Sequence, residues 1–115
     1  TYLSKTTASF VHVSLDAIKD QNVPTDSADS SNLQLDFWPH SGTTEWVQMR
    51  FDGARTLSST RVYWFDDTGR GACRVPKAWR VLYRDADGEF LPVTNRQPYT
   101  TNKDDFNRVE YRCVR

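Results

Sequence analysis

Cysteine is scarce in this 115-residue chain, which contains only Cys73 and Cys113. Two cysteines are too few for a disulfide scaffold or for a zinc site built on thiolates. A single bridge between them depends on the separation of their Cα atoms, which the sequence does not reveal. Because small buried thiols are common in folded domains, we expect both cysteines to be free.

An excess of either charge and a long apolar run are also missing. Fifteen Lys and Arg balance fifteen Asp and Glu, so the chain has no net field to attract nucleic acid or an anionic bilayer. No apolar run approaches the roughly 18 to 20 residues that span a membrane. We therefore expect neither nucleic acid nor a membrane as a partner. The first residues have no signal-peptide pattern.

Aromatic residues are plentiful, with four Trp, five Tyr and six Phe, and the hydrophobic pattern repeats every two residues. This combination is typical of β-strands. Short strands separated by polar turns predict one all-β domain over residues 1–115, a sandwich or a barrel. The expected strands are 9–14, 33–37, 45–51, 60–65, 79–83, 90–93 and 108–113.

Three connecting segments have a recognisable character. Residues 85–88 (DADG) lie between two strand patterns and predict a hairpin turn. Residues 15–20 give the only helical hint, about one turn long. Residues 21–31 are polar and without periodicity, which indicates a long loop.

Recognition chemistry is concentrated where an aromatic strand runs into the loop 66–74. The residues expected to bind a ligand are Phe65, Asp66, Asp67, Arg70 and Arg74. The carboxylates and guanidiniums can hydrogen-bond vicinal sugar hydroxyls, and the glycines of the loop allow a close approach of the backbone. An equally simple interpretation is structural, with an aspartate paired to an arginine so that the loop is pinned.

His40 lies in a second loop and completes the candidate ligand set, because an imidazole can bridge two hydroxyls. A loop histidine that is merely solvated is the alternative. Trp64 and Trp79 share strand faces with aliphatic neighbours and are expected in the core. For Trp38 and Trp46 we also favour packing over an exposed platform.

A family resemblance rests on two long motifs, WPHSGTTEWVQ at 38–48 and YWFDDTGRGACRVP at 63–76. They resemble the non-catalytic β-sandwich of bacterial glycoside hydrolases similar to β-L-arabinofuranosidases. The turn at 17–20 and the strands at 45–51 and 79–83 resemble the wider discoidin, or coagulation-factor C-type, family of galactose-binding-like domains. This resemblance implies a jelly-roll β-sandwich.

The resemblance also implies a cofactor. Discoidin-like modules often hold calcium at the turn that corresponds to Asp20, and Asp26 lies in the same oxygen-rich loop. The chain departs from the family pattern at Gln21, where a glycine is usual. It also ends after the strand 108–113, where such modules continue with a further strand pair, so we expect a fragment of a larger protein.

These observations predict a carbohydrate-binding accessory module rather than an enzyme. Asp66 and Asp67 are adjacent and would point to opposite faces of a strand, so they do not form a catalytic acid–base pair. The resemblance implies a glycan ligand, a parent glycoside hydrolase and an extracellular or periplasmic location. The alternative is a structural spacer that packs on the catalytic domain, with Tyr63 and Phe65 on its packing surface.

Overall fold

The computed structural model describes residues 4–12, 14–27, 34–38, 40–69, 71 and 73–115. Within these ranges the protein is all-β, and its strands form antiparallel pairs. The helical hint is confirmed as one short 3-10 turn, η1 (Asp16–Ile18). The described part of the chain contains no helix that is long and apolar enough to cross a bilayer.

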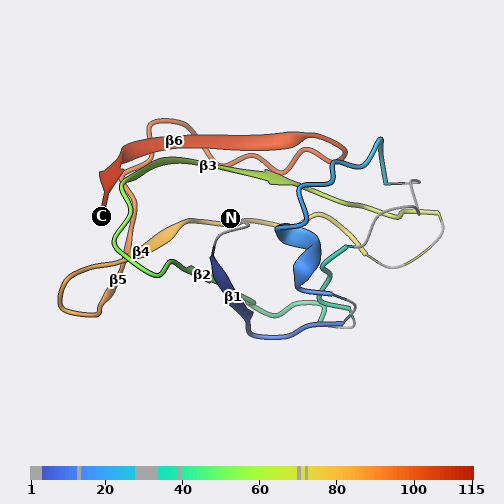
Figure 1. Cartoon of the computed structure of the whole chain (residues 1–115). Coiled ribbons are helices and arrows are strands. Elements are labelled where there is room, and N and C mark those ends of the chain that lie inside the picture. The colour runs from blue at the N-terminus through green and yellow to red at the C-terminus, as the bar shows by residue number, and fades with distance from the viewer. Residues whose placement is uncertain (1–3, 13, 28–33, 39, 70, 72) are drawn as a thin grey trace. The chain divides into compact units, whose positions relative to one another are not determined.

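The chain divides into two compact units. Unit 1 comprises Thr1–Gly53 and Asp67–Arg74, and unit 2 comprises Ala54–Asp66 and Val75–Arg115. Strands β1 and β2 belong to unit 1, and strands β3 to β6 belong to unit 2 (Figure 1).

Unit 1 is built on a short two-stranded ladder. Strand β1 (Lys5–Ala8) pairs antiparallel with β2 (Val47–Arg50), with Ala8 opposite Val47. The expected strand at 45–51 is therefore confirmed at its centre. The expected strand at 9–14 is absent over its described residues, 9–12 and 14, because the pairing lies earlier in the chain, at β1.

A side chain ends this ladder at Ser9. The backbone N–H of Ser9 still donates to the carbonyl of Trp46 at 2.9 Å. In return, however, the N–H of Trp46 donates to the Ser9 hydroxyl, also at 2.9 Å, instead of to a backbone carbonyl. A serine hydroxyl that replaces a ladder carbonyl in this way stops the regular pairing.

The expected strand at 33–37 is also absent over its described residues, 34–37. Asp36 is buried, and its carboxylate accepts a hydrogen bond from the N–H of Trp38 at 3.2 Å. The N–H of His40 donates to the carbonyl of Phe37 at 2.6 Å. These local bonds turn the chain where alternation alone predicted an extended strand.

Unit 2 contains a long pair and a hairpin. Strand β3 (Leu57–Tyr63) runs antiparallel beside β6 (Phe106–Val114) (Figure 1). Strand β4 (Leu82–Arg84) pairs with β5 (Phe90–Pro92), which confirms the predicted hairpin. Gly88 has a φ of +83°, a left-handed conformation that glycine adopts without strain.

The second edge of β6 is occupied near its end. The N–H of Arg96 donates to the carbonyl of Glu110 at 2.7 Å, and that of Arg112 donates to Thr94 at 3.0 Å. In the described part of the chain, the hydrophobic core is formed by Val109 and Tyr111 of β6 together with Val93. Partly buried side chains pack against it, namely Trp79, Val81, Tyr83, Tyr99 and Val114.

A shift of register interrupts the β3–β6 pair. Ser59 is opposite Glu110, whereas Leu57 is opposite Val114, so β6 accommodates extra residues between these positions. A bulge of this kind redirects the side chains that follow it. Cys113, two residues after the buried Tyr111, is exposed.

Candidate ligand-binding site

The predicted ligand loop is held by its own hydrogen bonds. Asp67 Oδ1 accepts a bond from the N–H of Cys73 at 2.8 Å and lies 3.5 Å from Arg74 Nη1. The same Arg74 nitrogen donates to the carbonyls of Gly71 at 2.9 Å and Cys73 at 2.8 Å. A Cβ at Gly71 would lie 2.2 Å from an Asp67 carboxylate oxygen, so a larger residue there would displace this carboxylate from its contacts with Cys73 and Arg74. The contacts match the structural interpretation of Asp67 and Arg74.

The other predicted ligand residues have different surroundings. Phe65 and Asp66 are partly buried and belong to unit 2. Arg70 lies outside the described residues. His40 belongs to unit 1, as Asp67 and Arg74 do, but its described contacts are with Phe10, Phe37, Thr43 and Glu45 rather than with the loop.

His40 and Glu45 form the centre of a polar cluster in unit 1. We call it the His40–Glu45 cluster, and it comprises Ser9, Phe10, His40, Thr43 and Glu45. His40 Nδ1 lies 2.6 Å from Glu45 Oε1, and the imidazole stacks on the Phe10 ring with centroids 3.9 Å apart. The Ser9 hydroxyl donates to Glu45 Oε2. Thr43 Oγ1 lies 3.0 Å from Glu45 Oε1 and 2.8 Å from the His40 carbonyl oxygen.

The order of groups determines what this cluster can do. The carboxylate stands in the middle, with the hydroxyl of Ser9 on one oxygen and the imidazole of His40 on the other. A serine nucleophile needs the imidazole as its direct partner, with the carboxylate behind it. The cluster instead orients the imidazole, because a carboxylate at Nδ1 favours the tautomer with its proton there and leaves Nε2 to accept a hydrogen bond.

The pKa of Glu45 is lowered below its ordinary value. The hydrogen bond from Ser9 lowers the pKa most, and the one from His40 lowers it next. Partial desolvation raises the pKa, and the hydrogen bond from Thr43 lowers it by a smaller amount. Hydrogen bonds to a carboxylate stabilise its charged form. Glu45 is therefore ionised throughout the neutral range.

A second imidazole–carboxylate pair lies in the same unit. His12 Nδ1 is 2.8 Å from Asp36 Oδ1, and the His12 ring lies against Trp38 with centroids 5.3 Å apart. The carboxylate is buried, whereas the imidazole is exposed. Both histidines of the chain are thus oriented by acidic side chains, a role that was not predicted for His12.

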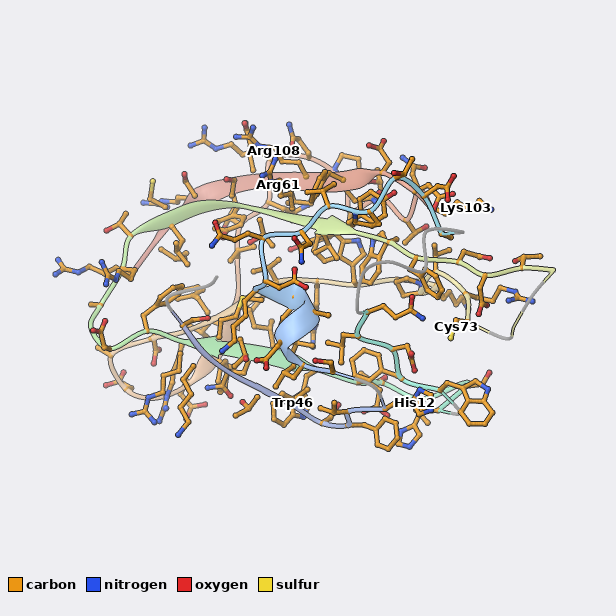
Figure 2. The ribbon with its side chains drawn as sticks, turned by 45° about the vertical axis from the view of Figure 1, so that its right-hand side comes forward. His12, Trp46, Arg61, Cys73, Lys103 and Arg108 are labelled. Carbon is orange, nitrogen blue, oxygen red and sulfur yellow. The ribbon has the colours of Figure 1, made fainter. Side chains whose placement is uncertain are left out.

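Two tryptophans expected to pack are half-exposed instead. Trp38 is 49% exposed and Trp46 is 52% exposed. Figure 2 shows the side chains of His12 and Trp46 at the margin of unit 1 that carries β1 and β2. Val47 and Met49, on the opposite face of the strand, are also exposed, at 36% and 39%, so the alternation in 45–51 does not account for the exposure of Trp46.

The residues predicted to bind calcium are not brought together as a cluster of acidic ligands. Asp20 Oδ1 accepts a hydrogen bond from the N–H of Asn22 at 2.9 Å, and Gln21 between them has a φ of +64°. Asp26 is exposed. Over the described ranges, no group of three or more His, Cys, Asp or Glu side chains is arranged to hold a metal ion. Calcium at Asp20 and Asp26 remains a prediction.

Comparison with known proteins yields no assignment. No protein-family model matches the chain, and no solved structure matches it.

Proposed function

We propose that this chain is a non-catalytic carbohydrate-binding module of a secreted or periplasmic glycoside hydrolase, with a discoidin-like jelly-roll sandwich. The single observation that carries the proposal is the exposure of Trp38 and Trp46 in the unit that holds both oriented imidazoles. The C–H face of a sugar ring stacks on an aromatic ring, and its hydroxyls require polar partners. Unit 1 offers both kinds of group.

Each group has a distinct role in this proposal. Trp38 and Trp46 present flat apolar surfaces to the sugar ring. His40, held by Glu45, and His12, held by Asp36, accept hydrogen bonds from sugar hydroxyls through Nε2. Because such an open site buries little area, we expect affinities of about micromolar to millimolar. A glycan is the proposed ligand, and the hydrolase domain is the proposed neighbour in the parent protein.

The proposal is tested by calorimetric titration with arabinose- and galactose-containing oligosaccharides. We expect binding by the wild-type chain and a loss of about tenfold or more in affinity for Trp46→Ala and for Trp38→Ala. Phe90→Ala is the matched control, because Phe90 is an aromatic residue that is 50% exposed in unit 2. Its affinity should equal that of the wild type. Absence of binding by the wild-type chain, or equal losses in all three variants, would contradict the proposal.

A structural spacer that packs on a catalytic domain is the second candidate. Tyr63 and Phe65, which this alternative would place on a packing surface, are partly buried, and Tyr63 packs edge-on against Phe106. The hairpin β4–β5 offers a different apolar surface, since Leu82, Phe90 and Leu91 are all exposed. A Phe90→Ala variant that binds sugar normally but loses association with the purified catalytic domain would favour this function.

A further inference from the structure

The outward face of the β3–β6 pair places two arginines directly opposite each other. In the antiparallel register Arg61 is the partner of Arg108, and Tyr63 is the partner of Phe106. The neighbouring positions Thr60 and Val109 form the inward face, where Val109 is fully buried. Figure 2 shows Arg61 and Arg108 on these two strands.

This placement is electrostatically unfavourable unless an anion is present. Like charges directly opposite each other on neighbouring strands repel and destabilise a sheet. Arg108 is paired with Glu110, with 3.1 Å between Nη2 and Oε1. Arg61 lies over the Phe106 ring at 4.6 Å from its centroid, and among the described residues it has no ion pair. Within the described part of the chain, Glu110 thus neutralises Arg108, and Arg61 has only its contact with the Phe106 ring.

A pocket continues this charged face at the bulge of β6. It has a volume of about 310 Å³ and is lined by Ser58, Ser59, Arg96, Arg108, Glu110 and Cys113, among others. Arg96 is exposed, and its side chain too has no ion pair within the described part of the chain. The bulge thus places a third guanidinium and two hydroxyls next to the Arg61–Arg108 pair.

This combination fits an acidic sugar. A guanidinium binds a planar carboxylate through two parallel hydrogen bonds, which makes arginine the preferred partner of that group. Ser58, Ser59 and Glu110 provide hydroxyl and carboxylate partners for sugar hydroxyls. Glu110 and the formal net charge of zero are unfavourable for any polyanion, so neither distinguishes a uronate from nucleic acid. The distinction rests on the free hydroxyls of a uronate polysaccharide, whose hydrogen bonds Glu110 can accept and which a DNA backbone lacks. A uronate polysaccharide is therefore favoured over DNA.

We propose that the outward face of β3–β6, with the pocket at its bulge, binds the carboxylate groups of an acidic polysaccharide. Arg61 and Arg108 hold one carboxylate jointly, and Arg96 binds a second group of the ligand. The proposal rests on residues of unit 2 alone, so it does not depend on the tryptophans of unit 1.

The test uses the full chain with three probes, namely polygalacturonate, a neutral galactan of similar length and a single-stranded DNA oligonucleotide. Binding is measured by affinity electrophoresis at low salt and at physiological salt. We expect polygalacturonate to bind more tightly than the oligonucleotide, with weaker binding at the higher salt concentration. The double variant Arg61→Gln/Arg108→Gln should bind polygalacturonate about tenfold or more weakly. Arg80→Gln, at an exposed arginine outside this face, is the matched control and should bind as the wild type does.

A chemical readout tests the pocket directly. In a Cys73→Ser background, Cys113 is the only thiol of the chain, and it lines the pocket. Saturating polygalacturonate should slow its alkylation severalfold, and the double arginine variant should lose this protection. The thermal unfolding midpoint of the variant, expected at or above that of the wild type because repulsion is relieved, verifies that it is folded.

The outcomes separate this proposal from the first one. Unchanged polygalacturonate binding in the double variant, or no protection of Cys113, overturns the acidic-sugar site. Equal or tighter binding of the oligonucleotide overturns it in favour of nucleic acid. If Trp46→Ala abolishes galactan binding but leaves polygalacturonate binding intact, both sites exist. If the wild type binds polygalacturonate but not galactan, only the tryptophan proposal fails.

Discussion

Among single residues, Glu45 links segments of unit 1 that are far apart in the sequence. It accepts hydrogen bonds from Ser9, which lies 36 positions earlier in the sequence, and from His40, five positions earlier. One ionised side chain thereby connects the end of β1, the loop that carries His40 and the start of β2. In the proposed binding module, a change at Glu45 would affect both stability and the orientation of the imidazole.

The lowered pKa of Glu45 predicts an acid-sensitive contribution to stability. Because the folded-state pKa lies below the unfolded value of about 4.3, this contribution is fully present above that value and is lost as the pH falls through the folded-state pKa. The difference in unfolding free energy between wild type and Glu45→Gln should therefore be largest at neutral pH and shrink towards pH 3. Chemical denaturation at a series of pH values measures it. Glu89→Gln, at an exposed hairpin position, is the control, and a constant difference for Glu45→Gln would contradict the prediction.

At the scale of an element, β6 is the strand that organises unit 2. It pairs with β3 along one edge and with the segment around Asn95 along the other, and it supplies Val109 and Tyr111 to the core. The segment that leads into β6 is held by Asn107, whose side chain is almost completely buried. Asn107 Oδ1 accepts bonds from Thr100 Oγ1 at 2.6 Å and from the N–H of Asn102 at 2.9 Å.

Asn107→Ala should destabilise unit 2 by about 3 kcal/mol, because it leaves several buried polar groups without partners. The lost bonds include those from Asn107 Nδ2 to the carbonyls of Asn102 at 2.8 Å and Asp105 at 3.0 Å. Urea denaturation followed by tryptophan fluorescence measures the change. Asn95→Ala is the matched control, since the side chain of Asn95 makes an exposed bond to Gln97, and its cost should stay below about 1 kcal/mol. Equal costs for the two variants would argue against the role assigned to Asn107.

Considered as a whole molecule, the chain distributes its tryptophans evenly but its buried apolar side chains unevenly. Trp38 and Trp46 belong to unit 1, and Trp64 and Trp79 belong to unit 2. In the described ranges, the buried apolar residues Val93, Val109 and Tyr111 all belong to unit 2. Trp64 and Trp79 also pack edge-on with centroids 5.7 Å apart, and both are partly buried.

This asymmetry predicts that unit 2 resists denaturant better than unit 1, since burial of apolar surface is the main stabilising contribution. A Trp38→Phe/Trp46→Phe variant reports on unit 2, and a Trp64→Phe/Trp79→Phe variant reports on unit 1. Fluorescence of the first variant should change at a higher urea concentration than that of the second. Circular dichroism of both variants provides the control for effects of the substitutions themselves. Coincident transitions would contradict the prediction.

The sequence was sufficient to predict the all-β class and the strands β2, β3, β5 and β6. It also predicted the single turn of η1 and the hairpin between β4 and β5. Each depends on a local property, either alternation of side chains along a strand or the turn residues Asp85 and Gly88. The predicted position of Trp79, which packs against the core, follows from the same alternation. The structure has no disulfide between Cys73, which is partly buried, and Cys113, which is exposed.

Tertiary structure alone decided which segments pair and which side chains meet. The partnership of Thr60 with Tyr111, whose hydroxyls lie 2.9 Å apart across 51 positions of sequence, has no local signature. The same is true of the bulge in β6, of Ser9 replacing a backbone partner of Trp46, and of Arg61 opposite Arg108. A periodic pattern specifies the face on which a side chain lies, whereas its partner depends on strand register between distant segments. For this reason the sequence by itself indicated the class of the fold and a plausible chemistry, while the two candidate surfaces emerged only from the structure.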